Sequence, residues 1–471
     1  VLLARHTRRP VKYVYTRREE FLDGRPAPGL VITVKTGVKL DGTITARSCT
    51  AYWDCGTGGG ALWATSRLRG VYHIPNFELH GYEVNTNQPA PGAYRAPGAP
   101  QATFASEAQL DEIACALGLD PLELRLRNLP EDRPQVCHRR TLQAVADRAG
   151  WATRTKGEYE GWGLAIGEWT NGAGPAGAVV SMANDGSVRL FYGMMDITGT
   201  DTGMAQIAAE VLGVPYEDVT VTRGDTNSSP YATASGGSVT SFSFGNAVRD
   251  AAADARRVLL EVAADHFSDE ETKVTVDQLE VADQRVWVTG QPETKASYAE
   301  LASLALRKGG PIVGEGRFSP KPSASTISAQ IVKVMVDPET GQTRILEHYQ
   351  SLDVGKALNP LACEGQMEGG GLQGLAWGMM EEMLYDPATG RNLNPDLLDY
   401  RLPTFCDAPA SVSVIVEEPT EHGPFGAKGI GEPPITCGMA AYGNAIADAI
   451  GIHLCEPPFT PERVWRALRN R

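Results

Sequence analysis

Three short turns between runs of alternating apolar residues do most to constrain the fold of this chain. They lie in "VKLDGTITA" around Asp41-Gly42, in "VVSMANDGSVRLFYG" around Asp185-Gly186 and in "VKVMVDPETGQTRIL" around residues 338–341. A glycine-containing turn flanked by alternating apolar and polar residues is the usual signal of a β-hairpin. Each stretch therefore predicts an antiparallel pair of strands.

Helical periodicity occurs between these hairpins. In "FASEAQLDEIACALG" four apolar residues fall on one helical face, namely Leu110, Ile113, Ala114 and Leu117. The stretches "AQIAAEVLG" and "AVRDAAADARRVLLEVAADHF" have the same period. The predicted fold class is therefore mixed α and β, of the α+β type.

The length of the chain indicates more than one domain. With 471 residues it exceeds the size of one ordinary domain. "LPEDRPQ" breaks the first regular segment and "GEYEGWGLAIG" opens a strand-rich one, so we predict a boundary within residues 130–158. The predicted domains are 1–145 and 146–471. The alternative is that the stretch is a long surface loop.

Charge and cysteine spacing disfavour several classes of function. The net charge is -14, from 43 Lys and Arg against 57 Asp and Glu, so no nucleic-acid partner is expected. The eight cysteines form no CxxC pair, which predicts neither an iron–sulfur cluster nor structural zinc in this chain and favours a reducing, cytoplasmic compartment. No apolar run is long enough to span a membrane. Because the sequence begins at Val1 rather than Met, a periplasmic location stays open.

One carboxylate stands in a crowded setting near the C-terminus. "GPFGAKGIGEPPITCGMAAYGNAIADAIG" places four glycines and a lysine before Glu432, and two prolines after it. Prolines suit the first turn of a helix, so Glu432 is predicted to precede a helix from Ile435 to Ala449. The helix dipole would then favour the ionised carboxylate that a general base requires. A plain acidic helix cap is the alternative.

Three other stretches place small polar residues and glycines before predicted helices. "NQPAPGAYRAPGAPQATF" sets Arg95 in a Gly- and Pro-rich loop before a helix starting near Gln101. "DITGTDTGMAQ" precedes a helix opening near residues 203–205, and "YATASGGSVTSFSFGNA" has the same character. Free N–H groups at helix starts can hold anionic groups. Neither a Walker lysine nor a GxGxxG fingerprint is present, which disfavours nucleoside triphosphates and ordinary dinucleotides. Singly, each stretch also suits an ordinary polar turn.

Glycines also interrupt the helical pattern of "NPLACEGQMEGGGLQGLAWGMMEEML", which carries Gln366 and Gln373. Glycine weakens a helix, so its repetition indicates that something approaches the backbone closely. A ligand and a tightly packed neighbouring helix are both compatible with this pattern.

Taken together and in order, five stretches resemble the molybdenum-binding subunit of the xanthine dehydrogenase and aldehyde oxidase family, the molybdenum hydroxylases. They are "GAYRAPGAPQATFASEAQLDEIA", "DITGTDTGMAQIAAEVLGVPYEDVTVTRGDT", "DPETG", "NPLACEGQMEGGGLQGLAWG" and "GPFGAKGIGEPP". The resemblance covers nearly the whole chain and implies the two-domain molybdopterin-binding architecture of that family.

The resemblance implies a molybdenum held by a pterin dithiolene, in the cytosine dinucleotide form, with no metal ligand from the protein itself. It assigns Glu432 as the catalytic base for inserting water-derived oxygen at an electron-poor carbon of an aldehyde or N-heteroaromatic ring. It assigns Pro97 to the substrate pocket. It assigns cofactor contacts to Arg95, Ala96, Thr198, Gly199, Thr200, Gly237, Ser238, Thr240, Gln366, Ile430 and Gly431. Alternative roles are a CO-oxidising or aromatic-thioester-reducing enzyme of the same family, or a non-catalytic half of a split subunit.

The sequence departs from the family pattern at three places. "DITGTDT" stands where many members have Gly-Gln-Gly, so Thr198 or Thr200 would replace the glutamine. Pro97 stands where purine-oxidising members have the stacking phenylalanine, which disfavours a purine substrate. The Gly-rich loop that shields the molybdenum is absent, so a further chain or segment is expected to supply it.

The resemblance also implies partners for electron transfer. Two electrons must leave the metal, and the cysteines and glycines of this chain provide neither cluster ligands nor a flavin fingerprint. We therefore expect an iron–sulfur subunit with [2Fe–2S] clusters and a subunit that binds FAD.

Overall fold

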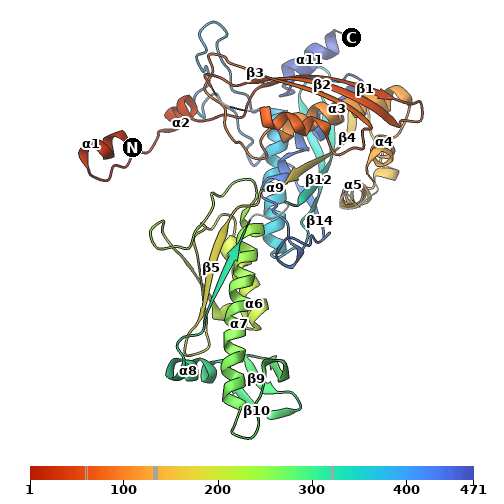
Figure 1. The fold of residues 1–471 in the computed structure, drawn as a ribbon. Helices are drawn as coiled ribbons and strands as arrows, with labels where there is room; N and C mark the ends of the chain where they lie inside the picture. Colours follow the sequence, from red (N-terminus) through yellow and green to blue (C-terminus); the bar gives the residue numbers. More distant parts are fainter. Residues whose placement is uncertain (59, 61, 131–135, 320–322, 471) are drawn as a thin grey trace.

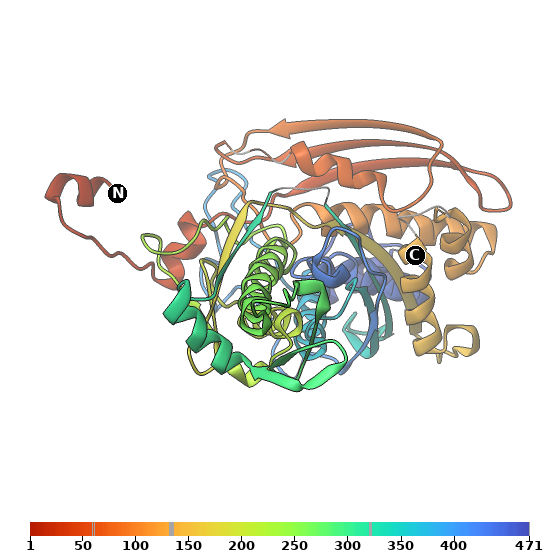
Figure 2. The same ribbon diagram turned by 60° about the horizontal axis from the view of Figure 1, so that its bottom comes forward.

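The computed structural model describes residues 1–470 except for 59, 61, 131–135 and 320–322. Figure 1 shows two lobes. We call residues 176–318 the lower lobe and the other described residues the upper lobe. The N-terminal helix α1 (Leu2–Thr7) extends away from the rest in both views (Figure 1, Figure 2), whereas α2 (Arg17–Asp23) contacts the upper lobe through Phe21 and Tyr400.

A three-stranded sheet forms one side of the upper lobe, in the order β1-β2-β3. Strands β1 (Leu30–Val38) and β2 (Ile44–Asp54) pair antiparallel, and β3 (Asn76–Val84) runs parallel to β2. Gly42 in the first turn has φ 86°, a left-handed conformation that favours glycine. The first predicted hairpin is therefore confirmed.

The central sheet of the upper lobe has the order β14-β13-β12-β4. Its strands are β4 (Glu160–Thr170), β12 (Ser325–Val336), β13 (Thr343–Asp353) and β14 (Ser411–Val416). The antiparallel β12–β13 pair confirms the third predicted hairpin. Helix α10 (Gly438–Ile450) packs on β4 so closely that a Cβ at Gly161 or Gly163 would overlap α10 backbone. The glycines of β4 therefore set the spacing between this sheet and α10.

The lower lobe contains a four-stranded sheet in the order β11-β5-β6-β7. Strands β5 (Ala176–Met182) and β6 (Val188–Tyr192) form the second predicted hairpin, followed by β7 (Val219–Arg223) and β11 (Val313–Phe318). The long helix α7 (Gly245–Phe267) packs along β11 and β5, and α6 (Thr200–Leu212) lies beside α7 (Figure 1). A smaller sheet, β8 (Leu279–Ala282), β9 (Arg285–Val288) and β10 (Gln291–Ser297), leads into α8 (Tyr298–Lys308).

The remaining α-helices belong to the upper lobe. They are α3 (Ala99–Leu117), α4 (Pro121–Asn128), α5 (Val136–Ala149), α9 (Pro360–Met379) and α11 (Pro461–Arg469). Short turns of 3₁₀ or π helix are η1 (Leu62–Arg69), η2 (Trp151–Thr153), η3 (Tyr216–Asp218), η4 (Thr240–Phe244), η5 (Val276–Gln278), η6 (Pro424–Gly426) and η7 (Pro433–Ile435). The predicted mixed fold class is confirmed.

The helix predicted from Ile435 to Ala449 begins later than expected. Residues Pro433–Ile435 form the separate turn η7, and α10 starts at Gly438. Conversely, the helices predicted near Gln101 and residues 203–205 begin earlier, at Ala99 and Thr200. Proline and glycine near a helix start are compatible with the first turn of the helix and with a separate turn before it. The residue at which each helix begins therefore depends on tertiary packing.

A hydrophobic core crosses the predicted domain boundary. Leu110 and Leu142 belong to the same buried cluster as Leu164 and Ile331. Part of the predicted boundary stretch, residues 131–135, lies outside the described residues. The division after residue 145 stays a prediction.

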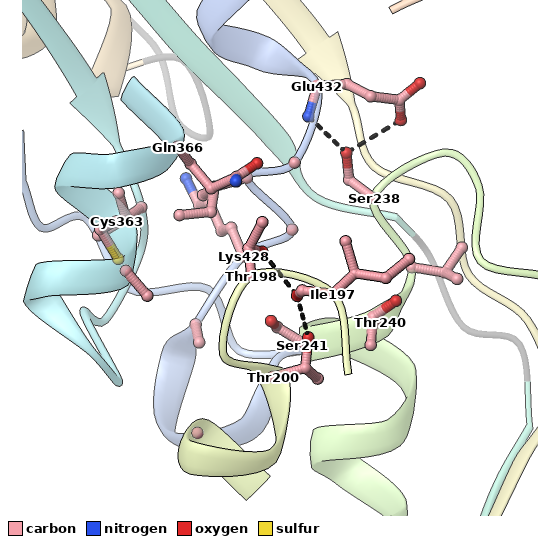
Figure 3. Close-up of a pocket in the computed structure, with 18 of the residues that line it drawn as sticks. Ile197, Thr198, Thr200, Ser238, Thr240, Ser241, Cys363, Gln366, Lys428 and Glu432 are labelled. Atoms are coloured by element: carbon pink, nitrogen blue, oxygen red, sulfur yellow. Dashed lines mark hydrogen bonds between the residues drawn. The ribbon is translucent and has the colours of Figure 1, made fainter. Parts of the chain in front are cut away.

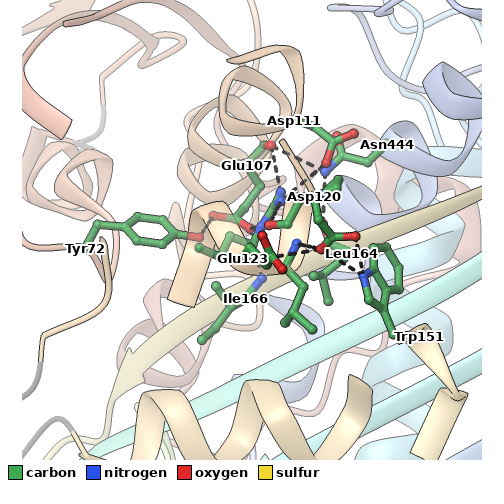
Figure 4. Close-up of polar contacts among 12 residues, drawn as sticks. Tyr72, Glu107, Asp111, Asp120, Glu123, Trp151, Leu164, Ile166 and Asn444 are labelled. Carbon is green, nitrogen blue, oxygen red and sulfur yellow. Dashed lines mark hydrogen bonds and ion pairs between the residues drawn. The ribbon is translucent and has the colours of Figure 1, made fainter. Parts of the chain in front are cut away.

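A buried ionic network holds α3 against the rest of the upper lobe (Figure 4). Arg125 of α4 is fully buried and donates from Nε to Glu107 Oε2 (2.8 Å) and from a terminal nitrogen to Asp111 (3.3 Å). Tyr72 donates to Glu107 Oε1 at 2.6 Å, and Asn444 of α10 donates to the Glu107 backbone carbonyl at 3.3 Å. Fixing α3 in this way also fixes the loop before it, which carries Arg95.

Candidate functional site

A cavity of about 560 Å³ lies where the two lobes meet. The lower lobe lines it with residues 197–200, 203, 204 and 235–241, and the upper lobe with residues 427–432, Arg95 and part of α9 (Figure 3). These segments come from five of the stretches singled out in the sequence. The tertiary structure thus brings distant glycine-rich segments into one pocket.

Glu432 lies at the edge of this cavity and is held from both lobes. The Ala96 N–H donates to its Oε1 (3.1 Å) and the Ser238 hydroxyl donates to its Oε2 (3.0 Å). The same hydroxyl oxygen accepts from the Glu432 backbone N–H at 3.0 Å (Figure 3). The carboxylate is therefore oriented by hydrogen bonds rather than left free to rotate.

Burial raises the pKa of Glu432 above its ordinary value. The donors on Ser238 and Ala96 and the positive charge of Arg95 act in the opposite direction. The helix predicted to follow Glu432 directly does not begin there, because the turn η7 separates Glu432 from α10, and burial outweighs the influences that lower the pKa. The ionised state of Glu432 at neutral pH stays a prediction. The hydrogen bonds from Ser238 and Ala96, which are distant in the sequence, favour the ionised carboxylate in place of the predicted helix dipole.

Arg95 is fastened to the segments around Glu432. Its Nε donates to the Gly431 carbonyl (2.7 Å), and its terminal nitrogens donate to the side-chain oxygens of Gln373 and Gln366, each at 3.1 Å. All these acceptors are uncharged, so none of them offsets the positive charge that the guanidinium places near Glu432. Burial lowers the pKa of Arg95, although Glu432 opposes this. The alternative that the stretch carrying Arg95 is only an ordinary polar turn is therefore not supported.

The loop that carries Glu432 is packed too tightly for larger residues. A Cβ at Gly429 would overlap the Ser238 carbonyl, and the Gly429 carbonyl accepts from Thr326 at 3.2 Å. Two residues after Glu432, the Pro434 carbonyl accepts from the Gln330 side chain at 2.7 Å. Close packing of the backbone thus accounts for glycine at residue 429.

The predicted anion-binding turn before α6 is open toward the cavity. A Cβ added at Gly199 or Gly203 would meet no atom within 4 Å. Thr198 has φ 60°, an uncommon conformation for a threonine. The hydroxyls of Thr198 and Thr200 both donate to the Ile197 carbonyl, at 2.6 and 2.7 Å. Backbone N–H groups and hydroxyl oxygens are therefore what this turn offers a ligand.

The second turn, residues 235–241, has a similar character. Gly236 has open space at its Cβ position, Gly237 has φ 69° and Ser238 has φ 62°. Thr240 shares a hydroxyl contact with Ser235 at 3.4 Å. A non-glycine residue held at positive φ is strained and occurs often at functional sites. Ala96, Thr198 and Ser238 all have this conformation, and all lie at or beside the cavity.

The glycines of α9 divide into two groups. A Cβ at Gly374 would lie 2.7 Å from the Ile435 carbonyl, and one at Gly370 would lie 2.5 Å from Pro434. Gly365 has no atom within 4 Å. Close packing against the segment after Glu432 thus explains glycine at residues 370 and 374. Gln366, next to the open Gly365, faces the cavity (Figure 3).

Most predicted site residues line the cavity, but two do not. Gly237, Ile430 and Gly431 do, along with the other assigned residues except Ala96 and Pro97. Both exceptions are buried in the loop just before α3, where the Ala96 N–H donates to Glu432. The assigned roles in binding and catalysis stay predictions.

Several lining residues were not predicted. Lys356 and Lys428 are the positively charged ones, and Asn359 and Cys363 add polar groups from the start of α9. Lys428 lies four residues before Glu432 in the same quoted stretch, and this closeness in sequence was the signal that could have indicated its place at the cavity. In the part of the chain that the structure describes, no group of three or more His, Cys, Asp or Glu side chains could hold a metal ion.

Comparison with known proteins agrees with this geometry. Profiles described as molybdopterin cofactor-binding domain match residues 1–129 and 139–409. The chain is 31% identical to the xanthine dehydrogenase molybdenum-binding subunit of Escherichia coli O157:H7, over 97% of this chain and 64% of that protein. It is 30% identical to the nicotine 6-hydroxylase large subunit of Paenarthrobacter nicotinovorans, over 100% of this chain and 63% of that protein. The chain thus spans just under two thirds of the length of these relatives.

Solved structures show the same fold. Quinoline 2-oxidoreductase from Pseudomonas putida 86 superimposes with a TM-score of 0.90 at 26% identity, covering 100% of this chain and 66% of that one. Aldehyde oxidoreductase from Desulfovibrio gigas gives 0.78 at 27% identity, covering 97% and 51%. None of the described helices has the length and apolar character needed to cross a membrane. The chain belongs to the molybdopterin-binding domains of the xanthine dehydrogenase and aldehyde oxidase family of molybdenum-dependent oxidoreductases.

Proposed function

We propose that this chain forms the catalytic molybdenum-binding part of a hydroxylase in which Glu432 is the general base. The enzyme would insert water-derived oxygen at an electron-poor carbon of an aldehyde or an N-heteroaromatic ring. The observation that carries the proposal is the carboxylate of Glu432 at the cavity edge, held by Ala96 from one lobe and Ser238 from the other.

The cavity suits a flat, anionic cofactor with many hydrogen-bonding groups. Gly199, Gly203 and Gly236 leave open space at their Cβ positions, and the turns around them present backbone N–H groups. Lys356 adds a positive charge. These features support molybdopterin as the ligand, and we propose that it is bound in the cytosine dinucleotide form. The residues proposed to hold it are Arg95, Thr198, Gly199, Thr200, Gly237, Ser238, Thr240, Gln366, Ile430 and Gly431, with Ala96 beside them.

When bound, the molybdenum centre would supply a two-electron acceptor and would lower the pKa of water. The chain's own residues would handle the proton. Glu432 takes it from the attacking water oxygen, and the hydrogen bonds from Ala96 and Ser238 keep the carboxylate aimed during this step. Arg95 stabilises the charged form of the base before the reaction.

The proposed enzyme needs further components. Ile197 lines the cavity and is 48% exposed. Met195, Leu361 and Phe425, each within two residues of a lining residue in the sequence, are 59%, 78% and 43% exposed. Exposed apolar side chains favour a covering partner. We propose that a segment or chain carrying the Gly-rich shielding loop covers them, and that electrons leave through partners with [2Fe–2S] clusters and FAD.

The test uses the purified complex that contains this chain. Molybdenum and pterin are measured first, and aldehydes and N-heterocycles are then screened with a dye as electron acceptor and ¹⁸O-labelled water as oxygen source. Glu432→Gln should keep the cofactor content and lose turnover by about 10²-fold or more, since a positioned base contributes roughly that much. A fully active Glu432→Gln enzyme would show that the base lies elsewhere, and a complex without molybdenum would refute the proposal. CO and aromatic thioesters belong in the same screen.

A further inference from the structure

The end of strand β4 holds a buried hydrogen-bond donor that has no acceptor. Trp169 is 5% exposed, and its indole Nε1 is buried and has no hydrogen-bond partner among the described residues. Such orphaned donors are rare in folded proteins because burial without a partner is unfavourable. Another tryptophan of β4 shows the ordinary solution: Trp162 donates from Nε1 to the Thr155 carbonyl at 2.9 Å.

The orphaned donor belongs to the surroundings of Glu432. Trp169 forms one buried cluster with Ala96, Ala99 and Ile435. Ala96 is the residue whose N–H donates to the Glu432 carboxylate, and Ile435 ends the η7 turn that begins directly after Glu432. The Trp169 indole is also among the groups that lower the pKa of Glu432.

Arg67 packs against the face of the Trp169 indole ring. The guanidinium of Arg67 lies over the Trp169 ring, 4.8 Å from its centre, and donates weakly to Thr170 at 3.5 Å. A cation over the ring face leaves the N–H edge free to point at an acceptor in the ring plane. The side chain is therefore kept in place without using its donor.

We propose that Trp169 is a positioning residue for Glu432, whose indole N–H donates a third hydrogen bond to the carboxylate when the base is ionised. The proposal rests on the proposed role of Glu432 as the base. In the described structure the carboxylate accepts from Ala96 and Ser238. A third donor would further stabilise the ionised carboxylate of Glu432 and restrict its rotation, so that it stays directed at the cavity.

The electrostatic surroundings define what a change at Trp169 should do. The charged group that faces Glu432 from the loop before α3 is Arg95, and the guanidinium of Arg67 lies over the face of the indole ring. The side chains that reach this region from α9 and β12, Gln366, Gln373 and Gln330, are neutral. Removing the indole N–H while keeping an aromatic ring should therefore raise the pKa of Glu432, because no charge changes and one donor to the anion is lost.

The experiment compares Trp169→Phe with Trp162→Phe in the assembled enzyme. Trp169→Phe should move the acidic limb of the kcat/KM profile about one pH unit upward, lower kcat below that pH and leave molybdenum and pterin content unchanged. Trp162→Phe removes an indole donor from the same strand, so it should cost stability and leave the acidic limb in place. An unmoved limb in Trp169→Phe, or an equal movement in both variants, would overturn the proposal.

A second readout does not depend on turnover. Infrared difference spectra during a pH titration, taken as wild type minus Glu432→Gln, isolate the carboxyl stretch of Glu432. Its midpoint should rise in Trp169→Phe by the same amount as the kinetic limb. If Glu432→Gln retains activity, the proposed function fails. If Glu432→Gln is inactive and the infrared midpoint is unmoved in Trp169→Phe, only the positioning role fails.

A further variant guards against misfolding. Replacing Trp169 by benzothienylalanine keeps the shape of the ring system and exchanges the N–H for sulfur. It should fold as the wild type does and reproduce the upward shift of the Glu432 midpoint. A wild-type midpoint in this variant would exclude the indole N–H as the responsible group.

Discussion

Lys428 and Asp353 form a buried ion pair that joins the loop carrying Glu432 to the end of strand β13. Lys428 Nζ lies 2.5 Å from Asp353 Oδ2, and the two side chains are 7% and 0% exposed. The other oxygen of Asp353 accepts from the Gly355 N–H at 2.9 Å, and the Lys428 N–H donates to the Val354 carbonyl at 3.0 Å. The loop leading to Glu432 is therefore held at Lys428 by a backbone hydrogen bond and by a side-chain ion pair.

Lys428→Met should destabilise the protein by about 3–5 kcal/mol, because it leaves the Asp353 charge buried and unpaired. Urea denaturation measures the effect. Lys356→Met is the matched control, since Lys356 also lines the cavity but pairs with Glu417 at 3.0 Å while half exposed, and its loss should cost less than about 1 kcal/mol. Adding Asp353→Leu to Lys428→Met should restore most of the lost stability. Equal losses in the two single variants would contradict the importance of the buried pair.

Ser238→Ala should raise the pKa of Glu432 further. The Ser238 hydroxyl is the largest of the influences that lower this pKa, and it donates directly to Oε2. Fewer donors favour the neutral acid, so the acidic limb of the kcat/KM profile should move to higher pH. Ser243→Ala provides the comparison, because Ser243 lies five residues further along the chain, is fully buried and accepts from the Gly174 N–H at 3.1 Å instead of contacting Glu432. That variant should leave the acidic limb at its wild-type position.

His348 should make the fold sensitive to acid. Burial lowers the pKa of His348 to about 4. Its Nε2 donates to Gln330 Oε1 (3.2 Å), because the Gln330 nitrogen already donates to Pro434, and its Nδ1 accepts from Ser411 (2.6 Å). The neutral ring suits this arrangement. A depressed pKa stabilises the fold above the unfolded value of about 6.5, and this contribution, about 3 kcal/mol, is lost as the pH falls to about 4.

His348→Gln should therefore remove that loss. The free energy of unfolding, measured from pH 7 to pH 4, should fall less steeply in the variant than in the wild type. Burial raises the pKa of Asp111 to about 6, which contributes a slope of opposite sign in this range. Because Asp111 is present in both proteins, the difference between their curves isolates His348. Parallel curves would show that the ring does not titrate with unfolding.

Gly374→Ala should destabilise the protein by about 1–3 kcal/mol, since its Cβ would press on the Ile435 carbonyl at 2.7 Å and force α9 away. Gly365→Ala on the same helix meets no atom within 4 Å and should be neutral or stabilising by up to about 1 kcal/mol. Thermal unfolding of the two variants checks the contrast. If Gly365→Ala were the more damaging change, the packing explanation for the α9 glycines would be wrong.

Local chemistry made part of the fold predictable. The hairpins around Asp41-Gly42, Asp185-Gly186 and residues 338–341 were all predicted, because a glycine turn and alternating strands are encoded within a few neighbouring residues. The helices α3, α6 and α7 were predicted for the same reason, from one repeated apolar face. Their exact ends depended on packing and differed by a few residues.

The surroundings of Glu432 were decided by the tertiary structure. Its sequence neighbours suggested a position directly before a helix, whereas the turn η7 separates it from α10. Burial raises its pKa, and the donors that oppose burial come from Ala96 and Ser238, far away in the chain. Trp169 and the Lys428–Asp353 pair gave no signal of their proximity to it. The sequence by itself determined which backbone shapes were possible and which segments could bind an anionic cofactor. The fold alone determined which groups meet, because hydrogen bonds, burial and charge act through space and not along the chain.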